Sequence, residues 1–114
     1  MRRHFVEING FRTRVDDRGG DSLLRRIQYL ILENPERGDT IAGTGGLRKM
    51  RVEDPSRGKG KRGGFRVIYL DLPDLERTFL ITLYGKSEKE DISSDEKRTL
   101  KRLVENLKDL RGRS

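Results

Sequence analysis

The chain has 114 residues, 32% of them hydrophobic and 39% charged, with 26 Lys and Arg against 19 Asp and Glu, a formal net charge of +7. This length suits one compact domain over residues 1–114. The chain has no cysteine and a single histidine, so it cannot form a disulfide, a thiolate metal site or a multi-histidine metal site. We therefore expect no cofactor. The positive charge favours a polyanionic partner, and because no segment is apolar enough for a membrane span or a signal peptide, we expect a cytoplasmic protein that does not bind membranes.

The first predicted elements are a short strand and two helices. Residues 4–8 are β-prone and end at an Asn-Gly dipeptide, which is typical of tight turns. Residues 11–18 can form a short helix, which the Gly-Gly pair that follows would end. A clearer helix then begins at a cap formed by Asp21 or Ser22 and ends at the Asn-Pro pair 34–35. Its apolar residues recur at helical spacing, namely Leu23, Leu24, Ile27, Leu30 and Ile31.

The middle of the chain is predicted to contain a strand with one basic face. Residues 36–46 are rich in Gly and Thr, which indicates an irregular connection. Residues 47–52 alternate apolar and basic side chains, so strand periodicity puts Lys49 and Arg51 on one face and the neighbouring apolar side chains on the other. Residues 54–64 then have the composition of a loop and carry many positive charges.

Two further strands and a helix complete the pattern. Residues 65–72 and 78–84 are strand-like and are separated by a short polar connection, so we expect an antiparallel hairpin. Residues 93–96 match the Ser-x-x-Glu capping box, and the apolar positions between residues 100 and 110 predict an amphipathic helix. The predicted order is β-α-α-β-β-β-α, an α+β domain with a small antiparallel sheet and helices packed on one side.

Basic side chains recur on the predicted strands as well as in the loop. Lys49 and Arg51 lie one pleat apart, Arg66 lies inside the strongest strand signal, and Lys86 follows a strand. If these strands are neighbours, the four cations can converge on one patch beside the basic loop. Strand parity alone leaves open whether they share a face.

Such a patch suits metal-independent cleavage of RNA through the 2′-hydroxyl. The reaction needs a group that accepts the hydroxyl proton, cations that stabilise the pentacoordinate phosphate, and a donor to the leaving oxygen. Lysine can transfer protons when neighbouring cations lower its pKa, and arginine can hold a phosphate through two hydrogen bonds. The same cations can instead form a solvated face, or bind phosphate without chemistry.

Other side chains near this patch are candidates for RNA binding or for support of the basic residues. Tyr84 can stack on a base, although an aromatic side chain in a strand more often packs in the core. Glu88 and Asp91 are candidate supports for Lys86, whereas the acidic residues of this region otherwise serve helix capping and solvation. We assign to RNA binding the residues Arg48, Arg57, Lys59, Lys61, Arg62 and Tyr84.

Three segments carry a family resemblance: residues 34–51, ending in Gly-Gly-Leu-Arg-Lys-Met-Arg, residues 57–69, ending in Gly-Gly-Phe-Arg-Val-Ile-Tyr, and residues 83–91, Leu-Tyr-Gly-Lys-Ser-Glu-Lys-Glu-Asp. Together they resemble the HigB-like branch of the RelE/ParE toxin superfamily. The resemblance implies a RelE-like fold and a ribosome-dependent mRNA endonuclease of a type II toxin–antitoxin system.

The resemblance also implies partners and residue roles. An antitoxin, often with a helix-turn-helix DNA-binding domain, would neutralise the toxin and carry it to operator DNA. Lys49, Arg51 and Arg66 match basic residues that contact and polarise the scissile phosphate in RelE-like toxins. Lys86 lies where the superfamily places another catalytic basic residue, so we assign it to proton transfer or phosphate stabilisation.

Two other functions remain open at the level of sequence. The ParE branch shares the fold but poisons DNA gyrase and lacks the nuclease residues, so the presence of all four basic residues argues against it. A basic module could also bind nucleic acid without cutting it. Some superfamily nucleases supply a His or Tyr from the extreme C-terminus, but residues 109–114 contain neither, and the general base is therefore not identified by the sequence.

Overall fold

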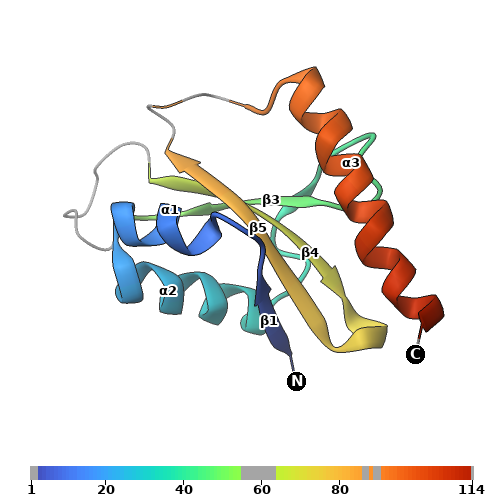
Figure 1. Ribbon diagram of the computed structural model, residues 1–114. Coiled ribbons are helices and arrows are strands. Elements are labelled where there is room, and N and C mark those ends of the chain that lie inside the picture. The colour runs from blue at the N-terminus through green and yellow to red at the C-terminus, as the bar shows by residue number, and fades with distance from the viewer. Residues whose placement is uncertain (1–2, 55–63, 86–87, 89–90, 114) are drawn as a thin grey trace.

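The computed structural model describes residues 3–54, 64–85, 88 and 91–113, which form one mixed sheet with helices packed against it (Figure 1). In chain order the elements are β1 (His4–Glu7), α1 (Phe11–Arg18), α2 (Gly20–Glu33), β2 (Asp39–Thr40), β3 (Arg48–Val52), β4 (Phe65–Leu72), η1 (Pro73–Leu75), β5 (Arg77–Gly85), α3 (Ser94–Lys108) and η2 (Asp109–Arg113), where η denotes a 3-10 turn. The α+β class and the predicted order are confirmed. The short strand β2 is an addition, because it lies in the segment that we expected to be irregular.

The five strands are ordered β1-β5-β4-β3-β2 in a single sheet. Strands β2 to β5 pair antiparallel, and the η1 turn joins β4 to β5 as the predicted hairpin. Strand β1 departs from the predicted antiparallel sheet, because it runs parallel to β5 at the edge. No tight turn joins β1 to its partner, so turn geometry, which is the local signal for strand direction, does not apply to this pair.

Both faces of the sheet are covered by helices, and the prediction that the helices pack on one side is therefore wrong (Figure 1). The central strand β4 sends Phe65, Val67 and Tyr69 into the cluster formed with α1 and α2. Its alternate residues Ile68 and Leu70 enter a second cluster, which α3 completes. A strand with apolar side chains on both faces needs cover on both faces, and the unbroken apolar run of residues 67–70 was the sequence signal for it.

The predicted N-terminal cap is found at α3 and is absent at α2. Ser93 and Glu96 form the predicted capping box, with hydrogen bonds of 3.1 Å from the Glu96 amide to Ser93 Oγ and 2.9 Å from the Ser93 amide to Glu96 Oε1. The predicted cap of α2 at Asp21 or Ser22 is wrong, since α2 already begins at Gly20 and has no side-chain cap. A single glycine separates α1 from α2, so the turn between these helices leaves no room for a separate capping residue.

Candidate functional site

Three cations form a row across two neighbouring strands on the face that α3 covers. Lys49 and Arg51 point away from the α1–α2 cluster, because Met50 and Val52 between and after them are buried in that cluster. Arg66 has the same parity on β4 as Ile68, which packs in the α3 cluster. Lys49, Arg51 and Arg66 therefore share one face, whereas the fourth predicted cation, Lys86, lies outside the described residues.

The register brings two of these cations directly opposite each other. Arg51 pairs with Arg66 across β3 and β4, and Arg66 pairs in turn with Tyr84 across β4 and β5. Like charges directly opposite on a sheet are destabilising, so this pairing costs stability unless an anion lies between or beside the two guanidinium groups. Arg51 is exposed and Arg66 is half-buried, so a polyanion can reach both side chains. We name the set of Lys49, Arg51 and Arg66 the cationic row.

One end of the cationic row is tied to the start of α3. The Lys49 ammonium lies 3.2 Å from Asp91 Oδ1, and the same oxygen accepts a hydrogen bond of 2.8 Å from the Ile92 amide. The Ile92 amide and the Lys49 ammonium hold the pKa of Asp91 below its ordinary value, while partial burial acts in the opposite direction. Asp91 is therefore a carboxylate that stays charged beside Lys49.

Tyr84 belongs to the core and is not available for stacking. Its side chain is 1% exposed and lies in the cluster that α3 completes. Burial raises the pKa of the Tyr84 phenol, as does the charge of Asp91, whereas the charge of Arg66 lowers it. Of the two roles considered for Tyr84, stacking on a base and packing in the core, the structure shows packing in the core, because a base would need an uncovered ring face.

Arg48 lies on the opposite face of the sheet from the cationic row. Its guanidinium donates to the backbone oxygens of Gly38, at 2.7 Å, and of Glu36, at 3.2 Å, and it also approaches the Glu36 carboxylate. Arg48 pairs in register with Tyr69, which packs against the α1–α2 cluster. The structure therefore does not bring this predicted RNA-binding residue together with Lys49 and Arg51, because adjacent residues on a strand face opposite ways.

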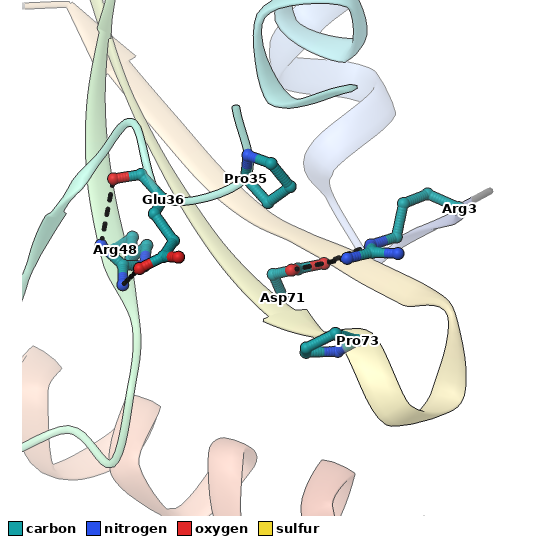
Figure 2. A pocket seen from close by; sticks show the side chains of 6 residues that line it. All are labelled: Arg3, Pro35, Glu36, Arg48, Asp71 and Pro73. Carbon is teal, nitrogen blue, oxygen red and sulfur yellow. Dashed lines mark hydrogen bonds and ion pairs between the residues drawn. The ribbon is translucent and has the colours of Figure 1, made fainter. Parts of the chain in front are cut away.

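A pocket of ≈ 340 Å³ opens beside Arg48, on this opposite face (Figure 2). Inside it the Arg3 guanidinium faces Asp71 at 2.8 Å, and Asp71 also accepts a hydrogen bond of 2.7 Å from Thr78 Oγ1. The positive and negative side chains of the pocket are paired with one another, so it differs in charge from the cationic row. The lining residues are Arg3, Pro35, Glu36, Arg48, Asp71 and Pro73.

The remaining predicted site residues lie outside the described part of the chain, namely Arg57, Lys59, Lys61, Arg62 and Lys86. The two acidic residues that we expected to support Lys86 have other described partners. Asp91 pairs with Lys49, and Glu88 accepts hydrogen bonds of 2.8 Å from Arg18 Nε and 3.0 Å from the Gly85 amide. These contacts hold the pKa of Glu88 below its ordinary value, the Gly85 amide contributing most. No local sequence pattern predicts the pair of Arg18 and Glu88, because these residues are separated by 70 positions in the chain.

The described part of the chain shows neither a cluster of metal ligands nor a helix suited to a membrane. Residues 3–54, 64–85, 88 and 91–113 contain no group of three or more His, Asp and Glu side chains arranged to hold a metal ion. Within the same residues, each helix is too short or too polar to cross a membrane.

Comparison with known proteins gives one family and one fold. A family model described as the RelE toxin of the RelE/RelB toxin–antitoxin system matches residues 31–114, a range that includes the whole cationic row. Among solved structures, the chain is similar to a mutant of the E. coli toxin RelE in the free state, in which two arginines are replaced by alanine. The similarity covers 79% of this chain and 90% of that chain, with a TM-score of 0.50 and 15% sequence identity. At that identity the solved structure supports the fold alone.

Proposed function

Because this chain belongs to the RelE toxin family, the toxin component of RelE/RelB toxin–antitoxin systems, we propose that it is an endoribonuclease that cuts mRNA on the ribosome and so stops translation. The observation that carries the proposal is the cationic row. Three basic residues lie on one face of two paired strands, and two of them are arginines directly opposite each other in register, which supports a site for a phosphodiester.

The proposed reaction is a transfer within the RNA itself. The 2′-oxygen attacks the adjacent phosphorus and its proton passes to a base. The bond to the 5′-oxygen of the next nucleotide breaks as an acid donates a proton to that oxygen, leaving a cyclic phosphate and a new 5′-hydroxyl end. Arg51 and Arg66 bind the non-bridging oxygens and stabilise the charge that accumulates on them in the transition state. Lys49 holds the RNA backbone beside them. Lys86 is proposed to transfer a proton or to stabilise the phosphate.

The partners follow from the family and from the charge of the chain. A cognate antitoxin is implied by the family, and we propose that it carries a helix-turn-helix domain through which the complex binds operator DNA. Ribosomes and mRNA are the proposed targets, which places the activity in the cytoplasm. The HigB-like branch rests on the sequence motifs described above and stays a prediction.

Expression in a bacterial host tests the proposal. Wild type should arrest growth and produce new mRNA 5′ ends inside translated reading frames, whereas Arg66→Ala should do neither, because it removes one of the two paired guanidinium groups. Arg25→Ala is the matched control, since Arg25 is exposed on α2 and its loss changes the net charge equally. Growth arrest with intact mRNA would refute the nuclease and favour a gyrase poison, and the absence of arrest with salt-sensitive RNA binding would favour a binding module.

A further inference from the structure

The carboxylate of Asp91 accepts hydrogen bonds from the next residue in the chain and from a lysine on β3. One oxygen receives both the Ile92 amide, at 2.8 Å, and the Lys49 ammonium, at 3.2 Å. The charge of a second lysine, Lys97, also acts on this carboxylate. Lys97 lies in the first turn of α3, so the two lysines whose charges act on Asp91 come from different elements, a strand and a helix.

The Asp91 carboxylate is easily replaced. Its side chain is 57% exposed and that of Lys49 is 29% exposed, so water competes for both charges and the pair contributes little to stability. The amide that holds Asp91 belongs to Ile92, whose side chain is buried in the α3 cluster, so the donor stays in place if the carboxylate swings away. What remains after such a movement is a fixed N–H and the Lys49 ammonium without its anion, and the charge of Lys97 acts on the same position.

We infer that Lys49, Lys97 and the Ile92 amide form a phosphate-binding subsite, which a backbone phosphate of RNA enters by displacing Asp91. The choice of RNA as the ligand rests on the proposed function. The subsite adds Lys97 and the start of α3 to the cationic row, and it lies about 7 Å along the strand from Arg51, since two residues of a β-strand span that distance. Adjacent phosphates of one RNA strand can therefore occupy the subsite and the Arg51–Arg66 pair together.

The subsite predicts that RNA binds more tightly when the charge of Asp91 is removed, and not when the charge of another acidic residue nearby is removed. Asp91→Asn keeps an oxygen that accepts from the Ile92 amide but removes the charge that competes with phosphate. Its affinity for RNA should rise about two- to fivefold, the range expected when a weak exposed ion pair no longer has to be broken. Asp95→Asn is the matched control, because it changes the net charge equally and lies in the same part of the chain, where Asp95 pairs with Arg98.

The measurement is fluorescence anisotropy with a short, labelled, single-stranded RNA in which every 2′-hydroxyl is methylated, so that cleavage cannot occur. Asp91→Asn should bind more tightly than wild type, Asp95→Asn should bind about as wild type does, and Lys97→Ala should bind less tightly. The increase in RNA affinity caused by Asp91→Asn should disappear when Lys49 is replaced by Met in the same chain. This increase should also become smaller as the salt concentration rises. Urea unfolding of each variant checks that the fold is retained.

Equal tightening by Asp91→Asn and Asp95→Asn would overturn the subsite, because the effect would then be one of net charge. Weaker or unchanged binding by Asp91→Asn would also overturn it, as would failure of every form to bind the methylated RNA. The proposed function fails differently: a protein that binds this RNA with the expected pattern but cuts no mRNA in cells would keep the subsite and lose the nuclease.

Discussion

The hydroxyl of Tyr69 ties the connection after α2 to the centre of the sheet, and its removal should be costly. Tyr69 is fully buried, its hydroxyl donates to the Pro35 oxygen at 2.8 Å, and it accepts from the Gly38 amide at 3.0 Å. Tyr69→Phe keeps the ring and removes both hydrogen bonds. Because Gly38 is buried, its amide cannot bond water in place of the hydroxyl, and an unpaired buried amide costs about 1–3 kcal/mol of stability. The oxygen of the partly exposed Pro35 can instead form a hydrogen bond with water.

We therefore expect Tyr69→Phe to lower the free energy of unfolding by about 2 kcal/mol. The assay is equilibrium urea unfolding at neutral pH followed by circular dichroism, in which this loss moves the midpoint by roughly 1 M if the slope is about 2 kcal/mol per molar. Tyr29→Phe is the control, because the hydroxyl of Tyr29 bonds Glu33 on a side chain that is 56% exposed. That control should cost less than about 0.5 kcal/mol.

A difference of less than about 0.5 kcal/mol between the two variants would refute this reasoning. It would mean that the Gly38 amide finds another acceptor when the hydroxyl is absent, and that the segment between α2 and β2 is not held by Tyr69. A change in the slope of the urea curve, rather than in its midpoint, would instead indicate an altered denatured or native ensemble.

Two further predictions concern pH and backbone strain. The pKa of Glu88 lies below its ordinary value of 4.5 in the folded protein, so its contribution to stability is present above that pH and is lost as the pH falls through the lower folded value. Glu88→Gln should accordingly unfold at lower urea than wild type at about pH 6 and differ less from it at about pH 3, and a gap that stays constant would contradict this linkage. Gly64 has a φ of +66°, and a Cβ there would lie 2.5 Å from the Val52 oxygen, so Gly64→Ala should cost more than about 2 kcal/mol. Gly10→Ala, with a φ of +90° and open space, should cost about 1 kcal/mol in the same urea assay, and equal losses would show that the contact with Val52 does not matter.

Several features of the fold could be read directly from the chain because their causes are local. The capping box of α3 joins residues three positions apart, the end of α2 is set at an Asn-Pro pair, and the β4–β5 hairpin turns over a few residues. Strand alternation likewise separated Lys49 and Arg51 from the apolar residues of β3. Each of these depends on hydrogen bonds or periodicities that a short stretch of sequence contains in full.

The site itself depended on the arrangement of the strands. Local periodicity identified the basic side chains, but the register of β3 on β4 put Arg51 opposite Arg66, and the position of α3 over the same face buried Tyr84. The tertiary structure also paired Asp91 with Lys49, 42 positions away in the chain. Sequence alone thus determined the local elements and the supply of cations, because these follow from neighbouring residues. Only the folded sheet decided which cations meet and which acid accompanies them, because strand order and register bring together residues whose separation along the chain carries no signal of their contact.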